Sequence, residues 1–407
     1  MQRNIGSTSQ AGHGVVRGLL IVSGLFLILL PTFTRSRAES SGQRGIAAHS
    51  NAYLADSKGR ASVETSNLFG VPNSTDVNQN QDYLFSDNFA CFLKPAGTTT
   101  PIRLYQVGEA VPGNPNSRGD LILTGARLNN SGVAVFVVDY PQTDGTFQRS
   151  ILKYTGTLQR MLDSQDIAPN SGGAQFGRNI SLAGENDNGD IALVAPLVAS
   201  SLNAPGQNTI FLIAANGAVT RITGQGNTAP GTGGGTFLNI ALPAGINSLT
   251  SGAEVVFGAQ ITGGVGGFGL FAASTGGVRK IVANGDPNPL GGNFSLTSAV
   301  ATVKVNPAGL VAFTIGNTIW THSVTDGIRS AVTLGDAAPT SIGGTYGSPP
   351  ALAALSESGV VVFAANVAGS AITPRGLFRF QSGNPTDVVA YAGEAAPGAG
   401  EIGRAHV

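Results

Sequence analysis

Cysteine, histidine and tryptophan are nearly absent from this sequence. It has one cysteine, Cys91, together with four histidines and one tryptophan. A single cysteine excludes a disulfide framework and a cysteine-based metal site. His322, the only histidine within the repeats described below, cannot build a multi-histidine metal site by itself. Because no G-x-S-x-G nucleophile elbow occurs, we expect His322 to be structural rather than part of a catalytic triad.

Charge is also scarce, and there is no basic excess. Charged residues make up 11% of the chain and the formal net charge is zero. Residues 39–400 carry 18 basic and 22 acidic side chains. No basic stripe is present to neutralise a phosphate backbone, which excludes nucleic acid as a partner. Hydrophobic residues reach 42%, which argues against a disordered chain.

Glycine is the abundant residue. There are 58 glycines in 407 residues, roughly twice the usual share of about 7%. Glycine supplies the positive φ angles that tight turns require. No window shows a convincing helical period, so the composition predicts an all-β fold of many short strands.

The two ends are predicted to lie outside the fold. Arg3 and Arg17 precede an apolar run and Pro31, which indicates a signal peptide or signal anchor over residues 1–38. Residues 39–60 are expected to form a polar linker. Residues 401–407 break the repeat and are expected to be a non-native tail derived from a sequencing adapter. We therefore expect an exported protein, extracellular, periplasmic or on the cell surface. Membrane contact is expected only through an uncleaved N-terminal segment.

A repeat of about 57 residues organises residues 61–400. Each unit has a turn in which an acid or amide stands three residues before a proline. The turn prolines are Pro112, Pro169, Pro230, Pro289, Pro339 and Pro397.

A second recurring element has the form Asn-x-x-Gly-x-x-x-Phe. It is complete at Asn129 to Phe136 and at Asn306 to Phe313, and it is degenerate around Gly252. A third element is a pair of apolar residues. The pairs are Phe92-Leu93, Ile151-Leu152, Ile210-Phe211, Leu270-Phe271, Ile319-Trp320 and Leu377-Phe378.

These elements predict four strands in each unit. Four strands in about 57 residues are typical of a propeller blade, and six blades fall within the range that closes. The expected fold is an all-β propeller of about six four-stranded blades. The alternative is another tandem array of β-sheets.

The repeats resemble a bacterial family of exported tandem-repeat proteins with the pattern NxxGxxxAF and a variable choice of surface anchor. Asn306 to Phe313 carries that pattern in full, and the resemblance covers residues 60–400. It implies export, and it implies no catalytic residues.

The repeated acids and arginines are the candidate ligand-binding residues. If equivalent positions form circles, the acids and the arginines nine or ten residues before each proline would line a charged rim. They are Glu109, Asp166, Asn227, Asp286, Asp336 and Glu394, with Arg103, Arg160, Arg221, Arg279 and Arg329. The alternative is that each acid caps its own turn and each arginine packs or pairs across strands.

Three other motifs in the sequence have more than one interpretation. Asp187 and Asp190 lie in an oxygen-rich stretch that could hold calcium or form an ordinary turn; no other cofactor is expected. The G-x-G-x-x-G at Gly264 precedes a predicted strand, which favours a glycine hairpin over a dinucleotide site. Asp163 with Asp166, or Asp187 with Asp190, could supply paired carboxylates.

The leading functional expectation is a monomeric, non-catalytic propeller that binds an unidentified extracellular ligand or serves as a cell-surface scaffold. One alternative is a carbohydrate-active enzyme that uses carboxylates at one end of the ring. With 7% aromatic residues, a sugar-stacking platform is poorly provided for. The other alternative is a calcium-stabilised adhesin.

Overall fold

The computed structural model describes residues 53–55, 61–63, 74–122, 125–142, 145–198, 207–241, 249–298, 300, 302–370 and 375–392. The chain divides into two units, Met1–Ser50 and Asn51–Val407, and every described residue belongs to the second. The predicted signal segment, most of the predicted linker and the predicted tail lie outside the described residues. The strand β1 (Tyr53–Ala55), which lies in that linker, pairs with β2 (Ala61–Val63), which follows the linker.

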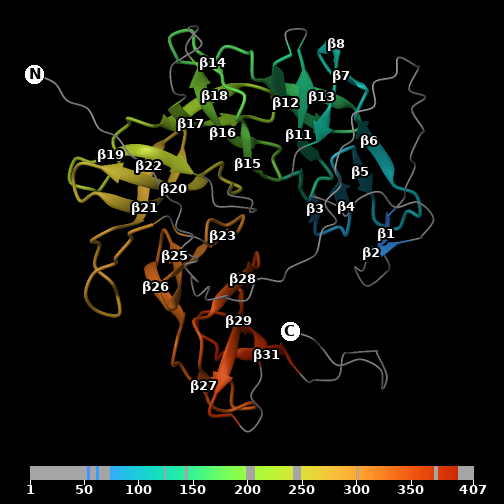
Figure 1. The fold of residues 1–407 in the computed structure, drawn as a ribbon. Coiled ribbons are helices and arrows are strands. Elements are labelled where there is room, and N and C mark those ends of the chain that lie inside the picture. The colour runs from blue at the N-terminus through green and yellow to red at the C-terminus, as the bar shows by residue number, and fades with distance from the viewer. Residues whose placement is uncertain are drawn as a thin grey trace, which may run out of the picture. The chain divides into compact units, whose positions relative to one another are not determined.

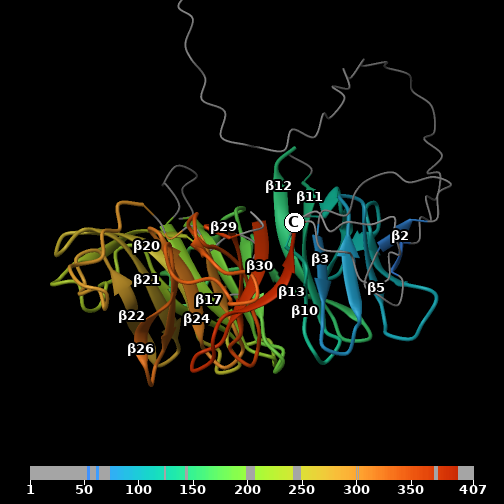
Figure 2. The same ribbon diagram turned by 90° about the horizontal axis from the view of Figure 1, so that it is seen from below.

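All regular elements in the described residues are β-strands (Figures 1 and 2). Apart from two two-stranded pairs, β1 with β2 and β7 (Ala110–Val111) with β8 (Asn114–Arg118), they form six antiparallel sheets that follow one another along the chain. Sheet 1 contains β3 (Ser74–Val77), β4 (Tyr83–Ser86), β5 (Ala90–Lys94) and β6 (Ile102–Gln106). Sheet 2 contains β9 (Leu121–Ile122), β10 (Arg127–Leu128), β11 (Ala134–Pro141), β12 (Phe147–Tyr154) and β13 (Leu158–Asp163). Sheet 3 contains β14 (Gln175–Phe176), β15 (Ser181–Glu185), β16 (Ile191–Val198), β17 (Gln207–Ile213) and β18 (Val219–Gly224).

The second half of the repeat region continues in the same way. Sheet 4 contains β19 (Thr236–Ala241), β20 (Val255–Thr262), β21 (Gly267–Ser274) and β22 (Gly277–Ala283). Sheet 5 contains β23 (Val303–Val305), β24 (Val311–Ile315), β25 (Thr318–Ser323) and β26 (Gly327–Thr333). Sheet 6 contains β27 (Thr345–Tyr346), β28 (Ala351–Leu355), β29 (Val361–Ala368), β30 (Arg375–Phe380) and β31 (Asp387–Tyr391).

Each sheet is a four-stranded meander, and in sheets 2, 3 and 6 the first strand is split into two short pieces that both pair with the second strand. The hairpin of β7 (Ala110–Val111) and β8 (Asn114–Arg118) precedes sheet 2. These sheets confirm the prediction of an all-β propeller fold with about six four-stranded blades.

The apolar core lies between consecutive sheets. Alternate residues of one strand enter different clusters: Ala134 and Phe136 of β11 pack with sheet 1, whereas Val135 and Val137 pack with sheet 3. Three further clusters join sheets 3 and 4, sheets 4 and 5, and sheets 5 and 6. Because successive side chains of a strand point to opposite faces, a strand that is apolar at every position must be covered on both sides.

The apolar pair of each unit marks a β-bulge. The register between the third and fourth strands shifts at the same place in all six sheets, for example between Ile151 and Leu152 and between Leu270 and Phe271. In sheet 1 the shift lies between Cys91 and Phe92. The equivalent pair in sheet 1 is therefore Cys91-Phe92, one residue before the predicted pair Phe92-Leu93.

The Asn-x-x-Gly turn requires a positive φ angle at its fourth position. Glycine occupies this position in sheets 2, 3, 5 and 6, whereas Gln81 has a φ of 65° and Ala253 a φ of 56°. Residues 250–253 are thus the fourth copy of the turn, which the sequence placed only approximately.

The Gly264 motif lies in the hairpin loop between β20 and β21, as predicted for a glycine hairpin. A Cβ atom on Gly264 would lie 2.0 Å from the carbonyl oxygen of Thr232, so a larger residue does not fit.

Candidate functional site

The Asn-x-x-Gly turns of all six sheets converge on one pocket of about 320 Å³, called here the six-turn pocket. Its wall contains four acidic side chains, those of Asp76, Glu185, Asp187 and Glu357. Among the described residues that line it there is no lysine, arginine or aromatic side chain. The pocket therefore offers mainly hydrogen-bond acceptors and amide groups.

Asparagine side chains join four of the six turns to the turn of the next sheet. Asn78 Nδ2 donates to the carbonyl oxygen of Asn129 over 3.0 Å, and Asn129 Nδ2 donates to that of Asn186 over 3.0 Å. Asn186 Nδ2 donates in turn to the carbonyl oxygen of Thr250 over 3.2 Å. Asn306 Nδ2 reaches the carbonyl oxygens of two residues in sheet 6, Ser356 and Glu357, over 3.2 and 3.1 Å.

The fourth turn has threonine in place of asparagine, and the backbone makes the link instead. Ser251 N donates to the carbonyl oxygen of Pro307 in sheet 5 over 2.9 Å. The Asn-x-x-Gly turns therefore also fix the docking of consecutive sheets.

Two of the pocket carboxylates hold the turns together. Asp187 accepts from Asn130 N and Nδ2, both over 2.9 Å, across the junction of sheets 2 and 3. Asp76 accepts from the backbone nitrogen of Leu128 in sheet 2 over 2.9 Å. Burial raises the pKa of Asp76, while that hydrogen bond and the charge of Arg127 lower it in part.

Glu185 is the most buried of the four acids, with 2% of its surface exposed. Burial raises the pKa of Glu185 to about 9, Lys153 opposes the shift, and the charges of Asp76 and Asp187 add to it. The Glu185 carboxyl group is therefore protonated at neutral pH, where it can donate a hydrogen bond. Its Oε1 atom accepts from Asn129 Nδ2 over 3.3 Å.

Sequence reasoning missed Asp76, Glu185 and Glu357 as pocket residues. They lie at different positions of their units, although each is within two residues of the first position of a repeated turn. An acid this close to the turn is the signal that could have identified them: Asp76 and Glu185 stand at positions where the other units have no acid, and Glu357 takes the same position as Asp187.

The predicted acids of the proline turns lie elsewhere, and none lines the six-turn pocket. Each described copy accepts a hydrogen bond from the backbone nitrogen three residues earlier, over 2.7 to 3.0 Å. The five pairs are Glu109 with Gln106, Asp166 with Asp163, Asn227 with Gly224, Asp286 with Ala283, and Asp336 with Thr333. Glu394 lies outside the described residues. The geometry is that of the turn-capping alternative.

The predicted arginines do not all occupy one equivalent position. Arg103, Arg160 and Arg221 face the second residue of the apolar pair, but in sheet 4 Lys280 takes that place and in sheet 5 Ser330 does. The position of Arg103, Arg160 and Arg221 lies nine residues before the turn proline. Arg279 and Arg329 lie ten residues before it and therefore occupy the neighbouring strand position.

The ion pairs to the acids of the proline turns are made from this corrected strand position. Arg103 forms an ion pair with Glu109 at 2.9 Å, Arg160 lies 3.5 Å from Asp166, and Lys280 forms an ion pair with Asp286 at 2.5 Å. Arg279 pairs with Glu254 at 2.6 Å, and Arg329 pairs with Asp326 at 2.8 Å. Arg221 donates to the carbonyl oxygen of Asn170 over 3.0 Å.

The calcium candidates Asp187 and Asp190 are engaged by protein donors. Asp190 accepts from Asn186 Nδ2 and from the backbone nitrogen of Ala215, both over 3.0 Å. Within the part of the chain that the structure describes, no group of three His, Cys, Asp or Glu side chains is placed to hold a metal ion. Asp163 is buried, and its carboxylate accepts from the hydroxyl groups of Tyr140 and Ser150.

His322 lies on β25 two residues after Trp320, and both side chains are buried. Burial lowers the pKa of His322, and the nearby charge of Arg279 lowers it further, against the opposing charge of Glu254. The neutral imidazole is a packed residue between sheets 4 and 5.

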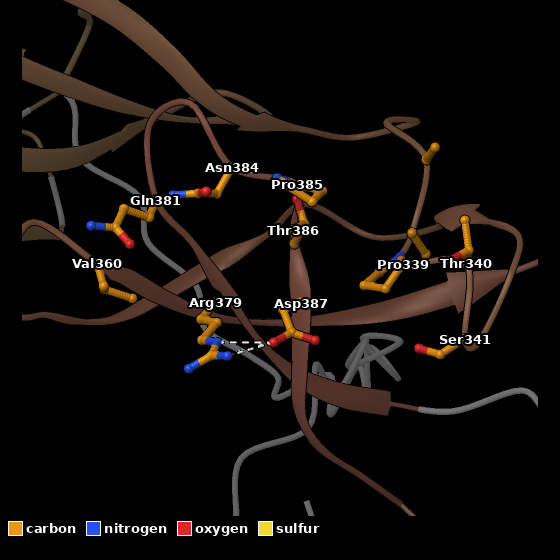
Figure 3. Close-up of a pocket in the computed structure, with 12 residues that line it drawn as sticks. Pro339, Thr340, Ser341, Val360, Arg379, Gln381, Asn384, Pro385, Thr386 and Asp387 are labelled. Carbon is orange, nitrogen blue, oxygen red and sulfur yellow. Dashed lines mark hydrogen bonds and ion pairs between the residues drawn. The ribbon is translucent and has the colours of Figure 1, made fainter.

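A second pocket, of about 920 Å³, lies against sheet 6 (Figure 3). One wall is the proline turn at Pro339, Thr340 and Ser341, and the other is the hairpin of β30 and β31. Arg379 pairs there with Asp387 at 2.6 Å, and this contact lowers the pKa of Asp387.

No helix in the described residues is suited to cross a membrane.

Solved structures with similar folds include a dipeptidyl peptidase 4 of Porphyromonas gingivalis, which is 9% identical with a TM-score of 0.39 over 80% of this chain. The chain spans 54% of that peptidase. A GH93 α-L-arabinofuranosidase of Fusarium graminearum is 10% identical with a TM-score of 0.36, covering 77% of this chain and 92% of the enzyme. A fucose-specific lectin of Aleuria aurantia is 11% identical with a TM-score of 0.29, covering 78% of this chain and 93% of the lectin.

At these scores the structural similarity carries no inference about binding or catalysis. No curated protein matches the sequence. A family model does match residues 79–318, from the first Asn-x-x-Gly turn to the start of β25, which is more than half of the chain. The chain therefore belongs to the family of unknown function DUF7453.

Proposed function

We propose that this protein is an exported, non-catalytic binding or cell-surface scaffold module whose six-turn pocket holds a small polyhydroxylated ligand. The observation that carries the proposal is the convergence of six repeated turns on one pocket of about 320 Å³ lined by amides and carboxyl groups. That volume suits a ligand of monosaccharide size. Planar amide and carboxyl groups can each bond to neighbouring hydroxyl groups of such a ligand.

The hydrogen bonds that the pocket carboxylates accept support binding without hydrolysis. Asp76 and Asp187 are held by donors from sheet 2, so their positions serve the junctions between sheets. Glycoside hydrolysis needs a second carboxylate that is free to act as a nucleophile or base. The predicted pairs of Asp163 with Asp166 and of Asp187 with Asp190 are engaged in turns and buried contacts. The resemblance to exported repeat proteins supports the location outside the cytoplasm.

Isothermal titration calorimetry with D-xylose, D-galactose and myo-inositol tests the proposal. We expect at least one of these probes to bind the wild-type chain and to bind Glu357→Gln at least five-fold more weakly. Asp120→Asn is the matched control, because Asp120 is also exposed and does not line the pocket. An equal loss in both variants, or no binding of any probe, would contradict the proposal.

One observation favours a carbohydrate-active enzyme as the second candidate. A carboxyl group with a raised pKa beside an exposed carboxylate is the arrangement of a general acid and its partner, and Glu185 and Glu357 line one pocket. Assays with nitrophenyl glycosides separate the two functions. Turnover that is lost in Glu185→Gln would establish the enzyme, whereas no turnover is expected of a binding module.

A further inference from the structure

In three consecutive sheets, a cation on the outer strand lies against the proline turn that leads into the same sheet. In sheet 3, Arg221 Nη1 donates to the carbonyl oxygen of Asn170 over 3.0 Å. In sheet 4, Lys280 Nζ donates to that of Gly231 over 2.9 Å. In sheet 2, the Arg160 guanidinium lies against Gly113, where a Cβ atom would be 3.1 Å from Nε.

The three contacted residues share one place in the repeat, since Gly113, Asn170 and Gly231 each follow the turn proline directly. In sheet 6 the corresponding residue is Thr340, which follows Pro339. The strand position that carries the cation is Val388, which is paired with Phe378 as Arg221 is with Phe211. The side chain of valine has no hydrogen-bond donor, so it cannot bind a carbonyl oxygen of the turn.

The second pocket lies at this same place in sheet 6. Thr340 and Ser341 form one wall, and Thr386 and Asp387, the two residues before Val388, form part of the other. Figure 3 shows the proline turn and the outer strand β31 on either side of this space. In sheets 2 to 4 the side chain of an arginine or lysine lies between the corresponding walls.

The pocket also contains a carboxylate. Asp387 Oδ2 accepts from Arg379, and Asp387 Oδ1 accepts from the backbone nitrogen of Val388. A carboxylate has about four acceptor sites, so further donors can be bound. In sheet 4 the cation has the same two kinds of partner, a turn carbonyl and an aspartate, because Lys280 also meets Asp286.

We propose that the pocket of sheet 6 binds a guanidinium group of a ligand, such as an arginine side chain, in the place where sheets 2 to 4 use a cation of their own. This site is separate from the six-turn pocket and does not depend on the function proposed for it. The ligand guanidinium would bond to the turn at Thr340 and to Asp387, and its alkyl chain would cover the apolar part of the wall.

Saturation-transfer difference NMR of arginine amide with the full chain tests this proposal. Citrulline amide, which has the same shape without the charge, is expected to give less than a third of the signal. Val388→Arg supplies the cation from within the chain and should reduce the arginine amide signal at least five-fold. The matched control is Val389→Arg, because Val389 is exposed at 49% and, as the unpaired bulge residue between Val388 and Ala390, does not occupy the strand position that carries the cation in sheets 2 to 4.

Equal signals for the two amides, or equal losses in the two valine variants, would overturn the proposal. If Val388→Arg does not fold by circular dichroism, Thr340→Tyr fills the pocket from the opposite wall. That variant must cause the same loss of signal, and an unchanged signal would overturn the proposal as well. Loss of sugar binding in the Glu357→Gln variant has no bearing on this result.

Discussion

The side chain of Asn129 closes its own turn and binds the carbonyl oxygen of Asn186 in the next sheet, over 3.0 Å. Its Oδ1 atom accepts from the backbone nitrogens of Ser131 and Val133 over 3.0 and 2.9 Å. The side-chain oxygen of Asn129 therefore closes the turn within its own sheet, and the side-chain nitrogen joins that sheet to the next. This double role explains why asparagine recurs at the position, since serine or threonine can close the turn but cannot make the contact between sheets.

Ala253→Gly should stabilise the protein. Ala253 has a φ of 56°, in a region that costs a residue with a Cβ atom of order 1–2 kcal/mol. Part of this gain is offset because glycine makes the unfolded chain more flexible, which leaves about 0.5–1 kcal/mol. Urea denaturation measures the change. Gly309→Ala reverses the substitution at the equivalent position, where φ is 86°, and should destabilise; the same sign in both variants would contradict this account.

Glu185→Gln should change how stability depends on pH. The native state keeps a proton on Glu185 up to about pH 9, whereas the unfolded chain releases it near the ordinary value of 4.5. A raised carboxyl pKa therefore makes wild-type stability fall as pH rises through this window. The glutamine variant lacks that loss.

The measurement is the free energy of unfolding of both proteins at pH 5 and pH 8. We expect the advantage of Glu185→Gln to be larger at pH 8 than at pH 5 by about 1 kcal/mol or more, the equivalent of roughly one pKa unit. Parallel pH profiles would show that Glu185 titrates normally.

Removal of calcium should leave the melting temperature unchanged. The carboxylates of Asp187 and Asp190 bond to amide and backbone donors of the protein, so the turn does not need a metal ion. Thermal melts in EDTA and in millimolar calcium provide the comparison. A rise in calcium that Asp190→Asn abolishes would favour the calcium-stabilised adhesin.

Ser356→Asn should stabilise the chain if sheets 6 and 1 are neighbours. Ser356 takes the first position of its turn, and its Oγ atom accepts from the backbone nitrogen of Val360 as an asparagine would. It has no amide to offer the turn at Asn78, although residues of both turns line the six-turn pocket. The new hydrogen bond should add about 0.5–1.5 kcal/mol. Ser358→Asn, two residues away, is the control, and equal effects in the two variants would argue against the junction.

The sequence predicted the sheets better than the site. Turns recur because each unit needs the same backbone path, so Pro169 and Asn306 could be recognised from spacing alone. The fourth turn was only approximate because Thr250 and Ala253 replace its two diagnostic residues. The sequence does not distinguish Arg279 from Lys280, because the two cations are adjacent, although they lie on different faces of the strand.

The six-turn pocket could not be predicted because it depends on tertiary structure. Asp76 and Glu357 are separated by most of the chain, and only the docking of six sheets brings their turns to one pocket. A repeat analysis searches for what units share, whereas Glu185 stands at a position that the other units do not use for an acid. The charge of its carboxyl group depends on burial, which no residue pattern specifies.

The central claim is that repeated asparagines join consecutive sheets, and the stability of Asn306→Ser tests it most directly. Serine keeps the acceptor for Leu310 N but loses both donors to sheet 6, which should cost about 1–3 kcal/mol in urea denaturation. Asn317→Ser, at an exposed hairpin turn, should change stability by less than about 0.5 kcal/mol. Equal effects of the two substitutions would contradict the claim.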